Sequence, residues 1–411
     1  MVSSTTPDFS NHFSIANIPF GVASCTKHPN PAPVTRILNN VVFLDVLARR
    51  GMFDGIDGLL LSHFEQSTLN PFAALGRQTH RAVRERLQNI ITTNQLPDES
   101  ITPVTDVTMH LPVRIEDFVD FSCVMEHIMS GTEIMTGKRV APPAFDYIPL
   151  GPLGQFRDKS ESASRPVKFG PSCELDYELE VACVIGKPVP VGERVVARVA
   201  DDHIFGVVLL NDWSARDLQE LEMVPMGPQA SKNFGTTVSP WIITLDALGP
   251  FPAEAPLPRY LPLSPYLVES PEATAYSVQL QAEYIPAVEP TGEETKPQVI
   301  CKSRLEWMNW SFRQMVAQFA VAGGGLNAGD LLASGTVSGS TDDARGCLYE
   351  LTWGWKHPLK LQDGSERTSL LDGDGIRITA WAGKPGEDAA SSGVGFGECT
   401  AIILPATPLF Y

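Results

Sequence analysis

The chain has 411 residues, of which 43% are hydrophobic and 19% charged, as expected of a globular protein with room for about two domains. The 31 basic and 48 acidic residues give a formal net charge of −17, which argues against nucleic acid or an anionic membrane as a partner. The seven cysteines are scattered singly and no apolar stretch approaches about 18 residues, so we expect no disulfide framework, no zinc ribbon, no membrane span and a cytoplasmic location.

The first quarter of the chain reads as short extended pieces followed by one helix. Residues 13–50 contain four prolines, which prevent a long helix there. A helix is predicted from Asn70 to about Thr92, because asparagine can cap it, proline follows at the first helical position, and apolar residues then recur at helical spacing. The polar stretch 93–108 is interpreted as a linker, with a domain boundary near residue 110.

The rest of the chain, residues 111–411, is predicted to be mainly β-structure with few helices, an α+β class. Strands are expected at 175–185, 203–210, 277–284, 330–337, 347–353, 376–381 and 396–403. One helix is predicted to start at the capping box Ser303–Glu306 and to end at the glycine run 323–325.

Two glutamates stand two residues apart in the predicted strand 175–185. Side chains at i and i+2 of a strand point the same way, so Glu178 and Glu180 would share one small volume with Asp176 on the same face. Bare carboxylates would repel each other there, and a hard cation with oxygen ligands removes that conflict. An exposed polar face is the plainer reading of the same pattern.

A third carboxylate, Asp212, follows the apolar strand 203–210 and precedes a short predicted helix. It is either a site residue at the end of a buried strand or an ordinary turn residue. On the helix, Arg216 and Gln219 are three residues apart and share a face. Together the three side chains offer an anion, a cation and an amide in one patch.

A histidine and two further carboxylates complete the candidates. If the segment after Asp120 is helical, His127 lies on the same face nearly two turns later and could act as a base beside a metal held by Asp120; a structural histidine is the alternative. Glu350 is the one acidic residue of the apolar predicted strand 347–353. A buried carboxylate needs a partner, and a histidine is a natural one.

These segments together resemble the fumarylacetoacetate hydrolase family, specifically its two-domain fumarylacetoacetases. The most specific run is Asn211-Asp-Trp-Ser-Ala-Arg-Asp217. Further matching segments are Ala16–Val22, Met109–Pro112, Leu175–Glu180, Phe234–Trp241 and Gly329–Ser340. The resemblance implies an SH3-like β-barrel over residues 1–110, a catalytic β-roll or sandwich over 111–411, and a homodimer.

The resemblance also assigns roles by motif position. It implies that the Mg²⁺ or Ca²⁺ ligands are Asp120, Glu178, Glu180 and Asp212, with Lys232, Gly235 and Thr236 around the metal. It implies that His127 is the general base and Glu350 its orienting partner. The groups near the substrate and the developing oxyanion would be Arg216, Gln219, Lys232 and Thr336.

Three positions depart from the pattern of fumarylacetoacetases. Ser122 and Pro152 stand where these relatives have tyrosines, and Thr136 or a gap stands where they have an arginine. All three changes remove polar contacts to an acidic substrate, and a buried carboxylate that loses such partners is costly to bind. The departures therefore predict a substrate other than fumarylacetoacetate itself.

The function predicted from these residues is metal-assisted hydrolysis of a carbon–carbon bond in a 1,3-dicarbonyl compound, the chemistry that the resemblance links to tyrosine catabolism. His127 would activate water, and the carbon would leave as an enolate whose charge the cation stabilises. The same chemistry could serve a decarboxylase, isomerase or cyclase of a specialised metabolite. A non-catalytic scaffold stabilised by the metal is a further alternative.

Overall fold

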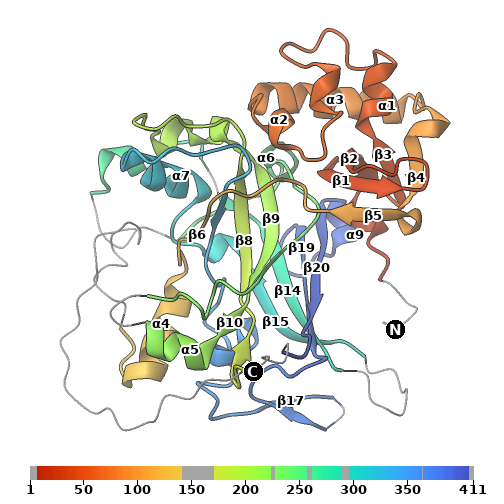
Figure 1. The fold of residues 1–411 in the computed structure, drawn as a ribbon. Helices are drawn as coiled ribbons and strands as arrows, with labels where there is room; N and C mark the ends of the chain where they lie inside the picture. Colours follow the sequence, from red (N-terminus) through yellow and green to blue (C-terminus); the bar gives the residue numbers. More distant parts are fainter. Residues whose placement is uncertain are drawn as a thin grey trace, which may run out of the picture.

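The computed structural model describes residues 7–140, 171–223, 227–256, 262–273, 275–287, 296–362 and 364–406. The fold is mixed and dominated by β-sheets. Figure 1 shows a small sheet with its helices at the top, coloured red and orange, and the longer strands of the remaining chain below.

The small sheet is antiparallel and has the strand order β4-β3-β2-β1-β5. Its strands are β1 (Phe20–Cys25), β2 (Ala32–Ile37), β3 (Asn40–Phe43), β4 (Ile101–Pro103) and β5 (Val107–His110). The interpretation of residues 93–108 as a linker was therefore wrong, because β4 and the start of β5 come from this stretch. Both are short edge strands, which need few apolar residues because one side of an edge strand is open to solvent.

Helices α1 (Leu44–Arg49), α2 (Asn70–Ala73) and α3 (Arg77–Thr92) accompany this sheet. The single helix predicted over 70–92 is two helices, because Gly76 between them adopts a φ of +86°. Val83 and Leu87 are buried on the inner face of α3, as their spacing predicts.

The small sheet shares a hydrophobic core with the rest of the chain. Phe20 of β1, Phe72 of α2 and Phe205 of β9 (Ile204–Asp212) pack with ring centroids 5.1–5.8 Å apart. Such aromatic contacts add to the burial of apolar area. The small sheet and its helices are thereby fixed against the strand that ends at Asp212.

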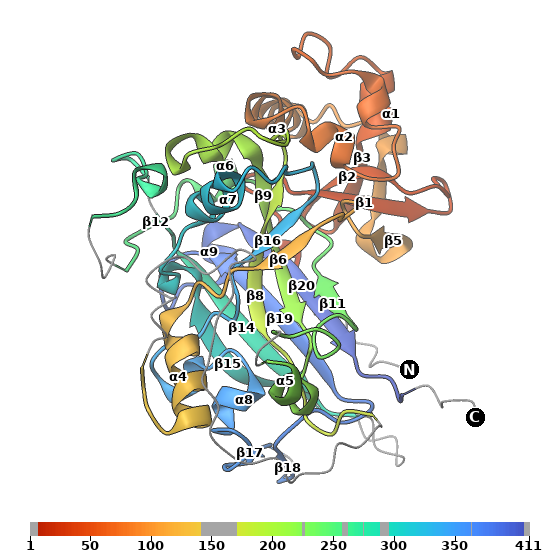
Figure 2. The same cartoon turned by 60° about the vertical axis from the view of Figure 1, so that its left-hand side comes forward.

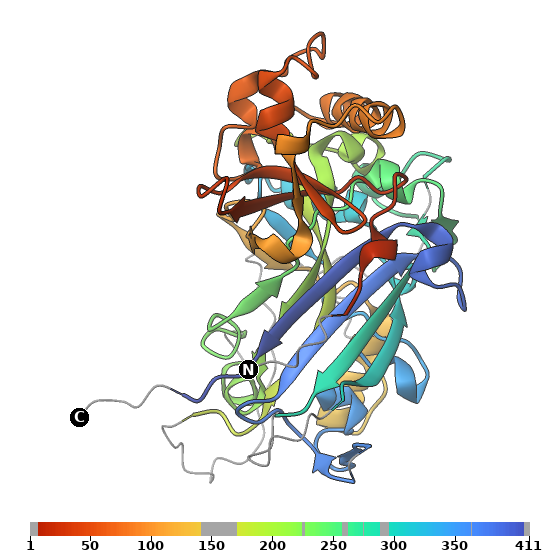
Figure 3. The same ribbon diagram turned by 90° about the vertical axis from the view of Figure 1, so that its right-hand side faces the viewer.

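Two further sheets of four or more strands lie in the remaining described chain. The five-stranded sheet has the order β11-β9-β8-β16-β6, and the four-stranded sheet the order β15-β14-β19-β20. Besides β9, the strands are β6 (Phe118–Asp120), β8 (Leu179–Ile185), β11 (Thr236–Val238) and β16 (Leu331–Ala333), then β14 (Val278–Ile285), β15 (Gln298–Arg304), β19 (Gly375–Ala382) and β20 (Gly395–Ile402). Figure 3 shows the teal and blue strands of the four-stranded sheet side by side. Every residue of β8 and β9 is buried, so the plainer reading of Glu178 and Glu180 as an exposed face fails.

Short pairs and helices connect the sheets. The pairs are β7 (Leu175–Asp176) with β10 (Ser214–Ala215), β12 (Pro252–Ala253) with β13 (Ala275–Tyr276), and β17 (Leu359–Lys360) with β18 (Glu366–Arg367). The helices are α4 (Met125–Thr136), α5 (Arg216–Glu222), α6 (Leu245–Leu248), α7 (Phe312–Val321), α8 (Leu348–Leu351) and α9 (Ala389–Ser392). None of the helices in the part of the chain that the structure describes has the length and apolar character needed to cross a bilayer.

Two predictions about local structure were wrong. Ser303 lies in strand β15, where its hydroxyl donates to Val337 O at 2.6 Å, and the capping box that starts α7 is formed by Ser311 and Gln314. Glu350 lies in the one-turn helix α8 rather than in a strand. A short apolar run in a sequence can form either a buried strand or a buried helical turn, and its pattern does not distinguish the two.

Candidate active site

Four carboxylates from distant segments converge at one end of the sheet β11-β9-β8-β16-β6. Asp120 ends β6, Glu178 precedes β8, Glu180 lies in β8 and Asp212 ends β9. One oxygen of each lies within 4.8 Å of the others, and we call these four residues the carboxylate cluster. The condition under which Asp120 and His127 would share a helix face is not met, because α4 begins only at Met125.

The cluster contains carboxylate oxygens with no hydrogen-bond partner among the described residues. These are both oxygens of Glu180 and Oδ1 of Asp212, all buried. Burial and the carboxylates of Asp120, Glu178 and Asp212 raise the pKa of Glu180 well above its usual value. Unsatisfied buried oxygens of this kind are costly, and they form the ligand set that Mg²⁺ and Ca²⁺ prefer. The residues present therefore fit a hard divalent cation.

Two basic side chains occupy part of the cluster. Lys232 Nζ lies 2.5 Å from Glu178 Oε2 and 2.9 Å from Asp212 Oδ2, and Arg216 Nη1 lies 2.8 Å from Glu178 Oε1. Burial would raise the pKa of Glu178, but Lys232 and Arg216 outweigh it and the pKa is lowered. Glu178 is thus held as a carboxylate, and the remaining acidic charge of the cluster is left for a cation.

Arg216 is oriented from two sides. Its Nη1 donates to Gln219 Oε1 at 2.9 Å within α5, as the three-residue spacing predicts. Its Nε donates to Asp176 Oδ2 at 2.9 Å. Asp176 is fully buried and also accepts from the backbone amides of Leu348 and Tyr349, at 2.7 and 3.1 Å, so it ties Arg216 to α8. The sequence reasoning placed Asp176 on the face of the glutamates and gave it no role.

His127 and Glu350 form a dyad in which the carboxylate is buried and the imidazole partly exposed. His127 lies in the first turn of α4, and its Nδ1 is 3.0 Å from Glu350 Oε2. Ser338 Oγ donates to the same oxygen at 2.5 Å, a contact the sequence reasoning missed. Burial alone would lower the pKa of His127, but the Glu350 carboxylate outweighs it and the pKa is raised. Figure 2 shows α4, α5 and α8 gathered at the same end of β8.

Three further predicted residues lie beside members of the cluster. The Ser122 amide donates to Asp120 Oδ1 at 2.6 Å, with Ser122 in a left-handed conformation at φ +47°. Thr236 pairs with Asp212 across β11 and β9, and Gly235 precedes it. Thr336 is buried, and among the described residues its hydroxyl has no partner.

One residue predicted to bind substrate, Thr136, is not brought to the cluster. Thr136 is exposed in the last turn of α4, where its hydroxyl donates to Thr132 O. At 1.5 Å per residue it lies about 14 Å along the helix from His127. Pro152 falls outside the described residues.

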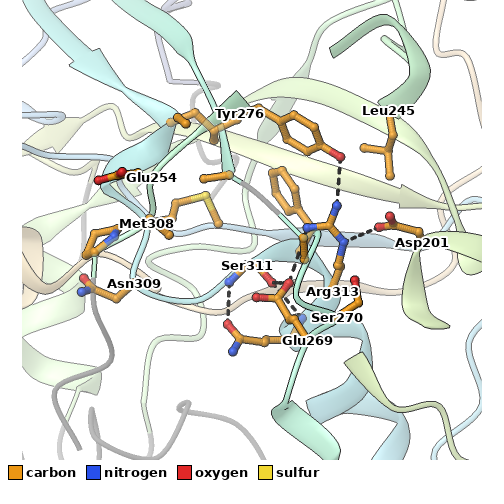
Figure 4. A pocket seen from close by; sticks show the side chains of 18 of the residues that line it. Asp201, Leu245, Glu254, Glu269, Ser270, Tyr276, Met308, Asn309, Ser311 and Arg313 are labelled. Atoms are coloured by element: carbon orange, nitrogen blue, oxygen red, sulfur yellow. Dashed lines mark hydrogen bonds and ion pairs between the residues drawn. The ribbon is translucent and has the colours of Figure 1, made fainter. Parts of the chain in front are cut away.

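A cavity of about 680 Å³ lies elsewhere, and none of the candidate site residues lines it. Figure 4 shows Arg313 in its wall, contacting Asp201, Glu269 and the hydroxyl of Tyr276. One residue of the wall contacts the helix that carries His127. Asn309 Oδ1 accepts from the amide of Met125, the first residue of α4, at 3.1 Å.

Comparison with known proteins identifies the family. Two family models match the chain: "Fumarylacetoacetase N-terminal" over residues 16–112 and "Fumarylacetoacetate (FAA) hydrolase C-terminal" over 139–401. The chain is 38% identical to a fumarylacetoacetase of Aspergillus fumigatus and 37% identical to one of Arabidopsis thaliana, in each case over 97% of both chains. A solved fumarylacetoacetate hydrolase from Exiguobacterium antarcticum matches with a TM-score of 0.48 and 14% identity, over 95% of this chain and 100% of that one. The chain therefore belongs to the fumarylacetoacetate hydrolase family, and the two fumarylacetoacetases it resembles are carbon–carbon bond hydrolases.

Proposed function

We propose that this chain is a hydrolase that depends on a divalent cation and cleaves a carbon–carbon bond in a fumarylacetoacetate-like 1,3-dicarbonyl compound. The observation that carries the proposal is the convergence of the carboxylate cluster and the His127–Glu350 dyad. Arg216 connects the two, because it pairs with Glu178 of the cluster and, through Asp176, with the helix that holds Glu350.

The cation proposed for the carboxylate cluster is Mg²⁺ or Ca²⁺. Asp120, Glu178, Glu180 and Asp212 would hold it, with Lys232, Gly235 and Thr236 beside it. When bound, such a cation supplies Lewis-acid polarisation of a carbonyl and stabilises negative charge. The unpartnered oxygens of Glu180 support this assignment.

The dyad would act as the general base. With Nδ1–H donated to Glu350, the Nε2 lone pair of His127 is free to accept a proton from water. Glu350 fixes this tautomer and stabilises the imidazolium that forms. General-base assistance of this kind contributes about 10²–10⁴-fold to the rate.

The basic groups would stabilise the oxyanion that forms when hydroxide attacks the carbonyl. Arg216 is held in place by Asp176 and Gln219, and Lys232 by the carboxylate cluster, so both can donate without reorganising. The buried hydroxyl of Thr336 is available for a further contact with substrate. The carbon–carbon bond then breaks with the electron pair leaving as an enolate, so no bare carbanion forms.

The substrate class includes fumarylacetoacetate itself. The predicted exclusion of that compound rested on Ser122, Thr136 and Pro152. Thr136 is exposed and distant from His127, and Pro152 is not described, so neither supports the exclusion. The relatives that are 37–38% identical over 97% of the chain are named fumarylacetoacetases, which favours the inclusive reading.

The architecture implied by the family resemblance forms part of the proposal. Residues 1–110 would be an SH3-like barrel domain and residues 111–411 the catalytic domain, and two chains would form a homodimer. The five-stranded antiparallel sheet of the first 110 residues supports the barrel. Sedimentation equilibrium tests the dimer, and a species of one chain mass at micromolar concentration would reject it.

The test of the function is turnover of fumarylacetoacetate by the purified protein with Mg²⁺ or Ca²⁺. The His127→Gln variant is expected to lose about 10²–10⁴-fold in kcat while it keeps its melting temperature. A matched control is His357→Gln, since His357 is an exposed histidine that takes no part in the dyad. Equal kcat values for the natural protein and His127→Gln would reject the base. Absence of cation-dependent turnover with fumarylacetoacetate and with a panel of acylpyruvates would reject the proposed activity.

A further inference from the structure

The dyad has a third potential ligand atom beside it. A nitrogen of His127, Sγ of Cys347 and a carboxylate oxygen of Glu350 all lie within 4.8 Å of one another. Nδ1 of His127 is 3.0 Å and Sγ of Cys347 is 3.5 Å from the same oxygen, Glu350 Oε2. We call these three residues the thiol cluster. It shares no residue with the carboxylate cluster.

The thiol cluster differs chemically from the carboxylate cluster. Four carboxylates suit hard cations, whereas thiolate, imidazole and carboxylate together form the ligand set typical of Zn²⁺. Zinc binds nitrogen at about 2.0–2.1 Å and sulfur at about 2.3 Å, so ligand atoms around one ion lie roughly 3–4 Å apart. The separations of 3.0 and 3.5 Å are of that size before any ion binds.

A second observation points to a ligand. Glu350 is 2% exposed, and its other oxygen, Oε1, has no hydrogen-bond partner among the described residues. The alternative is that the Cys347 thiol only donates a hydrogen bond to Glu350. That bond goes to Oε2, which His127 and Ser338 also contact, and it leaves Oε1 without a partner among the described residues. A cation held by both carboxylate oxygens would satisfy Oε1 while it lies beside Oε2.

We propose that His127, Cys347 and Glu350 form a second cation site, which takes a thiophilic divalent ion such as Zn²⁺ and whose occupation stops turnover. The ion reaches the cluster from the His127 side, because the His127 side chain is 18% exposed and that of Glu350 is 0% exposed. The inhibitory half of this inference rests on the proposed function, and the binding half does not.

The proton balance explains the inhibition. Binding replaces the thiol hydrogen of Cys347, which leaves to solvent as a proton, and no oxidation occurs. His127 must offer the Nδ1 lone pair to the ion, so its single N–H proton moves to Nε2. The imidazole then has no free lone pair with which to accept a proton from water, and the hydrogen bond to Glu350 is lost.

The binding half is tested with Cd²⁺ as a spectroscopic probe on the full chain, with Mg²⁺ present in excess to fill the carboxylate cluster. A thiolate-to-Cd²⁺ absorption band that saturates at one ion per chain is expected. The band should disappear in Cys347→Ser and persist in the matched control Cys173→Ser, since Cys173 is the exposed cysteine and the most accessible competing thiol. Absence of the band, or its survival in Cys347→Ser, overturns the site.

A second variant covers the case in which Cys347→Ser fails to fold. His127→Gln retains the thiol and loses the imidazole ligand, so Cd²⁺ affinity is expected to fall at least about tenfold while Cys173→Ser is unaffected. Unchanged Cd²⁺ affinity in His127→Gln overturns the three-residue site.

The inhibitory half is tested with Zn²⁺ at saturating Mg²⁺. We expect Zn²⁺ to reduce turnover at least tenfold in the natural chain, and Cys347→Ser to require at least tenfold more Zn²⁺ for half inhibition of its own uninhibited rate. Equal sensitivity of the two proteins overturns the inference, because Zn²⁺ then acts at the carboxylate cluster. A saturating Cd²⁺ band without loss of turnover supports the site and instead rejects the proposed base role of His127.

Discussion

Asp176 and Arg216 form a largely buried ion pair in the candidate site, with Arg216 Nη2 2.8 Å from Asp176 Oδ2 and side-chain exposures of 0% for Asp176 and 9% for Arg216. Asp176 also caps the first amides of α8, the helix that carries Glu350. The Asp176 carboxylate thereby positions both Arg216, which is proposed to stabilise the oxyanion, and the helix that carries Glu350, the partner of the proposed base. Both oxygens of Asp176 are occupied by these contacts.

The first prediction concerns this pair. Asp176→Asn is expected to lower the free energy of unfolding by about 1.5–3 kcal/mol, because the buried guanidinium of Arg216 loses one of its two carboxylate partners and keeps only Glu178. Urea denaturation measures the effect. The control is Glu65→Gln, whose partner Arg49 is 53% exposed, and which should change stability by less than about 1 kcal/mol. Similar losses in the two variants would contradict the role assigned to Asp176.

The second prediction concerns Glu180. Glu180→Gln is expected to weaken Mg²⁺ or Ca²⁺ binding at least about tenfold in calorimetric titration, because it removes one charged ligand. In EDTA the same variant should melt at a higher temperature than the natural chain, since burial and neighbouring carboxylates raise the pKa of Glu180 and an amide avoids that cost. Glu254→Gln, at an exposed position, should change neither quantity. Unaltered cation affinity in Glu180→Gln would exclude Glu180 as a ligand.

The third prediction concerns the glycine beside Asp120. Gly335 has a φ of +71°, and a Cβ there would lie 2.4 Å from Ser122 Cα and 2.7 Å from Asp120 Oδ1. Gly335→Ala should therefore destabilise the protein and weaken cation binding, through both backbone strain and the clash.

The control for this substitution isolates the strain. Gly58 has a nearly identical φ of +72°, and a Cβ added there would meet no described atom within 4 Å. Gly58→Ala should cost only the left-handed strain of roughly 1–2 kcal/mol and leave cation affinity unchanged. If both alanine variants lower the melting temperature equally and neither affects cation binding, the close approach of Gly335 to Asp120 has no functional consequence.

The fourth prediction concerns stability in acid. Burial lowers the pKa of His80 from 6.5 to about 4, and its ring is enclosed by those of Phe72 and Phe205. The unfolded chain takes up this proton near pH 6.5 and the folded chain only near pH 4, so stability should fall as the pH drops between these values and level off below them. The loss is on the order of 3 kcal/mol.

The comparison that isolates this effect is His80→Phe, which cannot take up the proton. The variant should show a shallower fall of unfolding free energy between pH 6.5 and pH 4 than the natural chain, measured by urea denaturation at each pH. Parallel pH profiles for the two proteins would show that His80 is not held neutral by the fold.

The sequence determined the local relationships of this protein. Spacing alone placed Arg216 and Gln219 on one helix face, put Glu178 and Glu180 close together, and located Asp212 at the end of a buried strand, because helix and strand periodicities fix which near neighbours share a side. The mainly β character of the second part followed from the same periodicities.

Only the tertiary structure decided which distant groups meet. His127 and Glu350 are 223 residues apart in the chain, and Asp120 reaches the glutamates through the strand order β6-β16-β8-β9, which no spacing in the sequence encodes. Glu350 proved to lie in a helical turn rather than a strand, and residues 93–108 proved to contain edge strands, because burial and pairing depend on what packs against a segment. The contacts of Asp176 and the neighbours of Cys347 came from that packing as well.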